Sequence, residues 1–166
     1  MKKYLFFIPM WVLATGNVWG GFAPSYQGAA MMIATLSMIL VSLVEEIIFR
    51  GFLLKAMLSE NKPVFAISVS AVTFGIGHII NLFTGQAGFE TVMQIFFAIS
   101  WGFILTMVCY KSGSIIPCII AHSLIDVLSL FSADNELFDW IYVGATIVTA
   151  IAYCIYLSRL PLPQSE

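Results

Sequence analysis

The sequence predicts an all-α, polytopic membrane protein with about six transmembrane helices in a single membrane domain, residues 1–166. Of its residues, 60% are hydrophobic and only 10% are charged, whereas soluble domains average about 45–50% apolar and about 25% charged residues. Long apolar stretches separated by short polar turns recur along the whole chain. The net charge of −2, without a basic run, argues against a nucleic-acid partner and leaves the lipid bilayer as the expected surroundings.

Six stretches are apolar and long enough to predict membrane spans, since a spanning helix needs roughly 20 mostly apolar residues. In chain order they are residues 4–20, 28–58, 63–83, 90–110, 114–132 and 138–158. The breaks between them contain turn-forming residues, as in GGFAPS, ENKP, TGQAG, KSGS and SADNE. The second stretch exceeds one simple crossing, so we expect its C-terminal part to tilt or to run along the membrane interface.

The charges outside the membrane predict the orientation of the spans. Six crossings place these basic residues on one side: Lys2, Lys3, Lys55, Lys62, Lys111 and Arg159. The opposite loops contain only acidic charges: Glu90, Asp134, Glu136 and Asp139. By the positive-inside rule, we expect a protein of the cell membrane with both termini in the cytoplasm.

The N-terminal stretch has a second interpretation. The sequence MKK, an apolar run and small residues near Gly21 and Ala23 are also typical of a cleavable signal peptide. Its removal would place the new N-terminus outside the cell. Because the apolar run is about as long as a span, we expect a retained membrane anchor.

Six ionisable residues lie within the predicted spans: Glu45, Glu46, Arg50, His78, His122 and Asp126. One charged side chain at a helix centre costs about 2.5–3.5 kcal/mol on insertion scales, so such groups need partners and usually mark a functional site. Glu46 and Arg50 are four residues apart, as are His122 and Asp126, so each pair shares a helix face. A structural ion pair would explain Glu46 and Arg50 alone, and packing would explain a single histidine. The concentration of all six ionisable residues on three spans favours catalysis or transport.

Serine hydrolysis is poorly supported by the pattern of serines. Ser123 directly follows His122, and adjacent side chains on a helix point apart. Ser68, Ser70 and Ser100 stay possible, but no nucleophile-elbow motif surrounds them.

A metal site and a metal-free carboxylate site are the remaining hydrolytic alternatives. A zinc hydrolase needs three protein ligands, and although the HExxH motif is absent, Glu45, His78 and His122 supply the right residue types. We expect no cofactor and keep zinc as an alternative. In the second alternative a carboxylate activates water directly, because a carboxylate in a water-poor site is a stronger base than in solution.

Three short motifs resemble those of a known family. EEIIFRG (residues 45–51) resembles an EExxxR motif, FGIGH (residues 74–78) an FxxxH motif, and HSLID (residues 122–126) an HxxxN or HxxxD motif. This order, over about residues 40–130, resembles the catalytic core of the CAAX-protease and bacteriocin-processing family, the Abi-type intramembrane proteases. Each motif alone is weak, but three in order on three of the spans are specific.

The resemblance implies a glutamate-dependent, metal-independent endopeptidase. It implies that Glu45 is the general base for a water that His78 also binds, and that Glu46 and Arg50 hold the helix and tune Glu45. His122 and Asp126 would stabilise the oxyanion of the tetrahedral intermediate. Many family members have Asn where this chain has Asp126, so either Asp126 is protonated or it orients His122.

The expected substrate is a peptide or a membrane-associated protein, in peptide or bacteriocin maturation or in self-immunity. A non-catalytic membrane partner or immunity protein is one alternative. A small proton-linked transporter, with the carboxylates as proton relays, is another, but the chain has no internal repeat. No oligomeric state is predicted.

Overall fold

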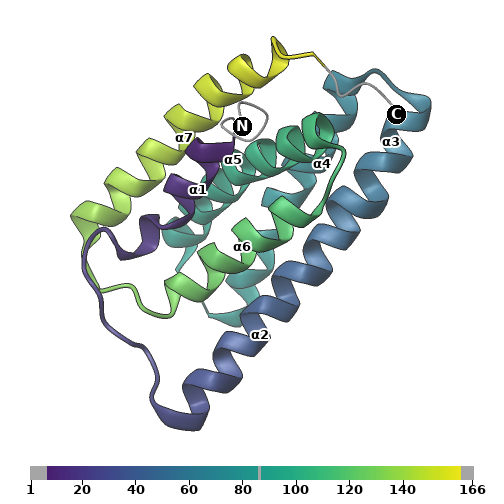
Figure 1. Cartoon of the computed structure of the whole chain (residues 1–166). Helices are drawn as coiled ribbons and strands as arrows, with labels where there is room; N and C mark the ends of the chain where they lie inside the picture. Colours follow the sequence, from purple (N-terminus) through teal and green to yellow (C-terminus); the bar gives the residue numbers. More distant parts are fainter. Residues whose placement is uncertain (1–6, 86, 162–166) are drawn as a thin grey trace.

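The structure is a computed structural model that describes residues 7–85 and 87–161. These residues form a bundle of helices without a strand, apart from one isolated bridge between Phe22 and Ser132 (Figure 1). In chain order the elements are α1 (Ile8–Ala14), η2 (Gly16–Val18), α2 (Gly28–Glu46), η3 (Ile47–Leu53), α3 (Leu54–Glu60), α4 (Pro63–Gly77), η4 (His78–Thr84), α5 (Gly88–Ser112), α6 (Ile116–Ser129) and α7 (Glu136–Ser158). The predicted all-α membrane bundle is confirmed.

The predicted spans correspond to apolar helices of unequal length. Four helical stretches in the described part are long and apolar enough to cross a membrane: Gly28–Glu60, Pro63–Phe83, Gly88–Ser112 and Glu136–Ser158. The first and fifth predicted spans are shorter apolar helices, Ile8–Val18 and Ile116–Ser129. The fifth begins late because the KSGS turn and Pro117, in the first helical turn, fix its start. The side of the membrane on which the termini lie stays a prediction, and Lys2 and Lys3 lie outside the described residues.

The stretch Gly28–Glu60 is one continuous helix of 33 residues. At 1.5 Å per residue it is about 50 Å long, well beyond the roughly 30 Å of a bilayer core, so part of it must tilt or extend past the hydrocarbon. Its middle section, η3, is π-helical. Insertions of this kind are frequent at functional sites, and η3 directly follows the two adjacent glutamates.

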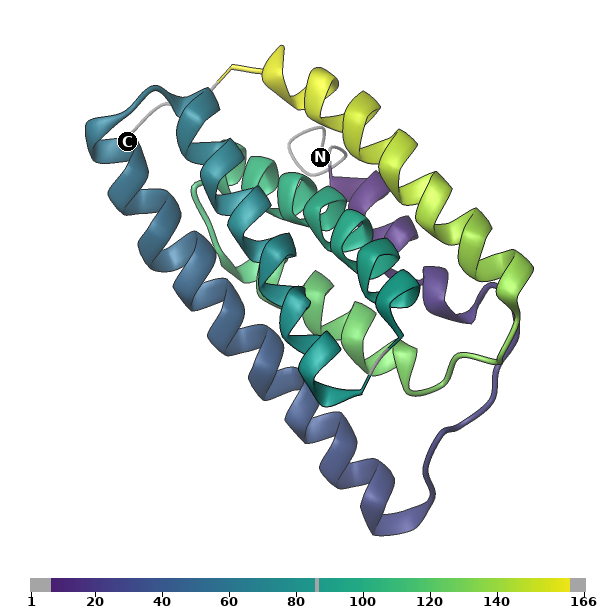
Figure 2. The same ribbon diagram turned by 180° about the vertical axis from the view of Figure 1, so that it is seen from behind.

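The remaining helices pack around α5. The stretch α2–α3 forms one edge of the bundle and α7 the opposite edge, with α4, α5 and α6 between them (Figures 1 and 2). Residues Ile104, Leu105 and Val108 of α5 are fully buried in the hydrophobic core. A Cβ atom at Gly102 would lie 2.6 Å from the carbonyl oxygen of Ala71, so the absence of a side chain there lets α4 and α5 approach closely.

The N-terminal segment is part of the packed bundle. Met10 and Ala14 of α1 are fully buried. The Asn17 side-chain amide donates to the carbonyl oxygen of Ile125 in α6 (2.7 Å), and the Tyr142 hydroxyl of α7 donates to the carbonyl oxygen of Leu13 (2.9 Å). These contacts hold α1 and η2 against the two C-terminal helices.

Candidate active site

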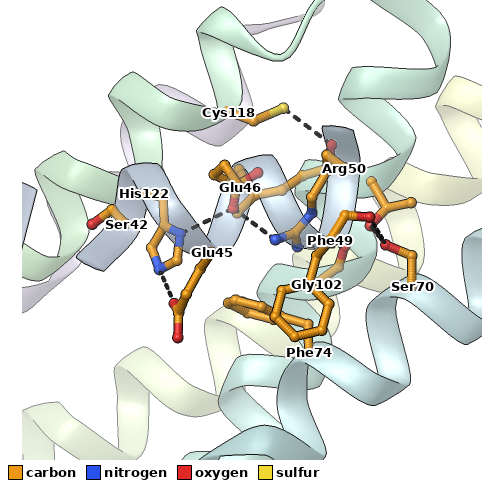
Figure 3. Close-up of polar contacts among 12 residues, drawn as sticks. Ser42, Glu45, Glu46, Phe49, Arg50, Ser70, Phe74, Gly102, Cys118 and His122 are labelled. Carbon is orange, nitrogen blue, oxygen red and sulfur yellow. Dashed lines mark hydrogen bonds and ion pairs between the residues drawn. The ribbon is translucent and has the colours of Figure 1, made fainter. Parts of the chain in front are cut away.

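The six ionisable residues predicted from the sequence come from four elements of the bundle. Glu45 and Glu46 end α2, Arg50 lies in η3, His78 begins η4, and His122 and Asp126 lie one turn apart on α6. Figure 3 shows Glu45, Glu46 and His122 pointing toward one another, with Arg50 on the far side of Glu46.

Glu46 is the centre of a fully buried polar group. Its Oε1 atom lies 2.6 Å from Arg50 Nη1 and 2.9 Å from His122 Nδ1, and the Glu46 and Arg50 side chains are both 0% exposed (Figure 3). Arg50 also donates from Nη2 to the carbonyl oxygen of Gly102 at 3.3 Å, and its guanidinium carbon lies 4.3 Å from the centre of the Phe74 ring. One carboxylate therefore joins α2, η3 and α6, and the guanidinium continues this link to α5.

The other nitrogen of His122 lies between two carboxylates. Its Nε2 atom is 3.6 Å from Glu45 Oε2 and 3.5 Å from Asp126 Oδ2. Both separations exceed the usual hydrogen-bond length of about 2.7–3.2 Å. Polar groups separated in this way are commonly bridged by water or by a ligand atom.

Exposure distinguishes the two adjacent glutamates. The Glu45 side chain is 32% exposed, and that of Asp126 is 24% exposed, in contrast to the sealed Glu46–Arg50 pair. Neighbouring positions on a helix point about 100° apart. The side chain of Glu45 therefore faces an accessible region, whereas that of Glu46 points into the protein interior. Glu45 is therefore the carboxylate that water can approach.

His78 reaches the same region from the end of α4. Its Nδ1 atom lies 3.3 Å from the carbonyl oxygen of Phe74, one turn earlier. The Phe74 ring lies edge-on between the two imidazoles, with its centre 5.4 Å from that of His78 and 5.4 Å from that of His122. His78 and His122 also line the same cavity. All six predicted residues thus belong to one neighbourhood.

A cavity of about 700 Å³ opens beside these groups. Phe74, His78, His122 and Asp126 contribute to its wall. Its other side chains include five aromatic residues, Phe89, Phe97, Trp101, Trp140 and Tyr142. Four carboxylates also line it: Glu90, Asp134, Glu136 and Asp139. Its volume lies in the range of ligand-binding pockets, about 300–1,000 Å³.

The structure also shows the surroundings of the residues considered for a zinc site and for a serine nucleophile. Among residues 7–85 and 87–161, no group of three or more His, Cys, Asp and Glu side chains is arranged to hold a metal ion. Of the candidate serines, Ser70 donates to the carbonyl oxygen of Phe49 and Ser100 to that of Phe96. The hydroxyl of Ser123 is buried without a hydrogen-bond partner.

One polar residue of this neighbourhood was missed in the sequence. Ser42 of α2 is fully buried, and its hydroxyl lies 2.6 Å from Asp126 Oδ2. Its spacing offered a signal, because residues 42, 46 and 50 recur at intervals of four and so follow one face of the helix.

The fold and the site define a helical membrane protein with a buried carboxylate–histidine centre beside a cavity. The chain belongs to the family described as type II CAAX prenyl endopeptidase Rce1-like, whose model matches residues 27–128. This match confirms the resemblance to the CAAX proteases and supports a membrane-embedded protease. All six candidate residues lie within the matched range. Comparison with curated proteins and with solved structures gave no match.

Proposed function

We propose that the protein is an intramembrane endopeptidase in which Glu45 activates a water molecule without a metal ion. The observation that carries this proposal is the arrangement around His122 Nε2, which lies 3.6 Å from Glu45 and 3.5 Å from Asp126 at the wall of the cavity. His122 and Asp126 line this cavity, and Glu45 lies next to His122, so three polar groups converge at its edge. The family match supports the protease class.

In this mechanism the Glu45 carboxylate accepts a proton from water as the water oxygen attacks the carbonyl carbon of the scissile peptide bond. The carbonyl oxygen becomes an oxyanion in the tetrahedral intermediate. Glu45 then passes its proton to the leaving nitrogen, the carbon–nitrogen bond breaks, and a carboxyl and an amine product leave. A general base of this kind contributes about 10²–10⁴-fold to the rate.

The neighbouring groups have supporting roles. His78, which also lines the cavity, binds the attacking water together with Glu45. His122 faces the oxyanion, and a preorganised donor of this kind is worth about 2.7–4 kcal/mol in acyl transfer. The Glu46–Arg50 pair holds His122 through Nδ1 and keeps a second free negative charge away from Glu45.

For the substrate we propose a peptide or a membrane-associated protein that reaches the cavity from the bilayer. The aromatic side chains of the cavity favour an apolar segment next to the scissile bond. The family description is of a CAAX prenyl endopeptidase, and peptide or bacteriocin maturation or self-immunity is the role that we favour for this chain.

The test uses the full chain in lipid nanodiscs with internally quenched peptides, one series carrying a farnesylated C-terminal cysteine and a matched series without the lipid. Wild-type protein should cleave one of the two series, and Glu45→Gln should not. Glu60→Gln, at an exposed position on α3, is the matched control and should retain activity. Cleavage that survives Glu45→Gln, or that a chelator abolishes and zinc restores, would overturn the mechanism. Absence of cleavage in both series would favour a non-catalytic membrane partner or a transporter.

A further inference from the structure

The cavity beside the candidate active site has an acidic end, formed by Glu90, Asp134, Glu136 and Asp139. Glu90 lies in the first turn of α5, Asp134 in the loop before α7, and the other two in the first turn of α7. All four side chains are exposed. In the described part of the chain, no lysine or arginine lines the cavity, and no ion pair involves these carboxylates. Their charge is therefore available to a ligand.

Helix starts and membrane orientation explain only part of this pattern. Acidic residues stabilise the first turn of a helix, which accounts for Glu90, Glu136 and Asp139. Asp134 lies outside any helix, and the positive-inside rule keeps basic residues from one side of a membrane without requiring acids there. Among the residues that the structure describes, no three of the side chains that bind metals are grouped to hold an ion. Carboxylates spread in this way suit an elongated organic cation better than a metal ion, which needs its ligands at one point.

Two aromatic rings lie among the carboxylates. The ring centres of Phe89 and Trp140 are 5.6 Å apart, both residues line the cavity, and they are 64% and 43% exposed. Trp140 Nε1 lies 3.5 Å from Glu136 Oε1, so the indole is next to a carboxylate. Aromatic faces beside carboxylates bind ammonium and guanidinium groups, and the planar guanidinium of arginine fits both kinds of partner.

A buried hydrogen-bond donor in the cavity wall indicates a peptide ligand. Trp101 lines the cavity and is 3% exposed, and its indole nitrogen has no hydrogen-bond partner among the described residues. Tyr142, which packs against the same Phe97 ring, donates its hydroxyl hydrogen to the carbonyl oxygen of Leu13 (2.9 Å). Buried N–H groups nearly always have an acceptor, and a carbonyl oxygen of a peptide in the cavity would supply one.

Helix α6 sets the distance from the candidate catalytic groups to the acidic end. His122, Asp126 and Ser129 line the cavity in turn, and the chain then continues to Asp134. Ser129 follows His122 by seven residues, which is about 10 Å of helix at 1.5 Å per residue. An extended peptide covers this length with about three residues, at about 3.3 Å each.

We propose that the acidic end binds a basic side chain of the peptide substrate, preferably arginine, about three residues from the scissile bond. This proposal rests on the proposed function and names its substrate class, a peptide with a basic residue beside an apolar segment. The carboxylates pair with the guanidinium, Phe89 and Trp140 pack on its faces, and Trp101 donates to a peptide carbonyl oxygen nearer to His122.

Binding to the full chain carrying Glu45→Gln tests the subsite without cleavage. The protein is placed in nanodiscs of phosphatidylcholine, which has no net charge. Fluorescence anisotropy then compares short apolar peptides that have one arginine near either end with matched peptides that have citrulline, the uncharged analogue of arginine. An arginine peptide should bind on the order of tenfold more tightly than its citrulline match, and high salt should reduce this difference. Equal affinities, or binding of neither peptide, would overturn the proposal.

Variants without the acidic charges locate the preference. Glu136→Gln combined with Asp139→Asn should reduce the preference for arginine several-fold, and Glu90→Gln should reduce it from α5. Because these side chains are exposed, we expect the variants to fold, which their unfolding curves check. Glu60→Gln removes an exposed charge outside the cavity and is the matched control, with an unchanged preference. A preference for arginine that survives neutralisation of all four carboxylates would assign it to another surface and contradict the proposal.

Cleavage by the wild type separates this proposal from the proposed function. The ratio of kcat/KM for an arginine peptide to that for its citrulline match should exceed one and fall in the neutralised variants. Mass spectrometry should place the cleaved bond about three residues from the arginine. Preferential binding without cleavage would contradict the proposed function alone, whereas cleavage without a preference for arginine would contradict the acidic subsite alone.

Discussion

Glu46 and His122 lie 76 residues apart in the chain, yet Glu46 Oε1 and His122 Nδ1 are 2.9 Å apart in the interior of the bundle. The same Glu46 oxygen contacts Arg50. Glu46, whose charge Arg50 balances, therefore holds the His122 imidazole through Nδ1, and Nε2 stays available on the side of the cavity. This division between a sealed side and an accessible side underlies the predictions that follow.

Replacing Glu46 should destabilise the protein because it leaves Arg50 buried without a partner. Breaking a buried pair by removing one member typically costs about 3–5 kcal/mol. We expect Glu46→Leu to unfold at clearly lower denaturant concentration, measured by circular dichroism in detergent. Glu46→Leu combined with Arg50→Met should recover much of the loss. A double variant as unstable as the single one would mean that the pair is not the source of the stability.

His78→Ala should abolish cleavage while the protein remains folded in the membrane. His78 contacts the carbonyl oxygen of Phe74, one turn earlier, and lines the cavity. It takes no part in the contacts that Glu46 makes with Arg50 and His122. We expect a rate loss within about 10²–10⁴-fold, as for removal of a general acid–base group, with an unchanged unfolding curve. A large loss of stability instead would assign His78 to packing.

Position 126 should tolerate asparagine and not alanine. Asparagine offers an oxygen and an amide hydrogen to Ser42, so Asp126→Asn should keep much of the activity, whereas Asp126→Ala removes the contact with α2 altogether. His122→Ala should also be inactive, because it removes the group that faces the oxyanion. Initial rates with the cleaved peptide measure all three. If Asn is as inactive as Ala, the site needs the carboxyl group itself, as a proton relay or a metal ligand would.

The orientation in the membrane is open to direct measurement. A reporter fused after Glu166 should be cytoplasmic, and one inserted near Gln86 should be external, because the basic residues lie at the opposite ends of the spans from Glu90, Asp134, Glu136 and Asp139. An external C-terminal reporter would contradict either six crossings or the retained N-terminal anchor.

Removal of the N-terminal segment should destabilise the bundle. Deleting residues 1–21 would remove the buried Met10 and Ala14 and the bond from Asn17 to Ile125. We expect the shortened chain to be degraded or to aggregate on extraction, measured by its yield and by size-exclusion chromatography. A shortened chain that is as stable as the full one would favour the cleavable signal peptide.

Local patterns in the sequence predicted the helices and the type of site, but not the contacts between helices. The apolar runs and turns predicted all six apolar helices, although the length of α6 was overestimated because its apolar character continues beyond the helix. The spacing of four residues predicted the Glu46–Arg50 pair, which depends on one helix alone.

Contacts across the bundle depend on how the helices pack and were beyond local patterns. The spacing placed Asp126 beside His122, and His122 Nε2 lies 3.5 Å from Asp126 Oδ2, but the shorter contact of Asp126 is with Ser42 on another helix. The partner of His122 is Glu46, whose position relative to α6 follows from the packing of two helices. A family motif names the residues of such a site but not which oxygen meets which nitrogen.

The two kinds of contact at Glu46 also differ in when they can form during biosynthesis. Arg50 lies one turn away, so this pair can neutralise itself as soon as α2 becomes helical, which eases the entry of both charges into the bilayer. The imidazole of His122 is synthesised 76 residues later. The growing chain therefore carries Glu46 and Arg50 into the membrane already paired, and the contact with His122 forms only after α6 has been synthesised.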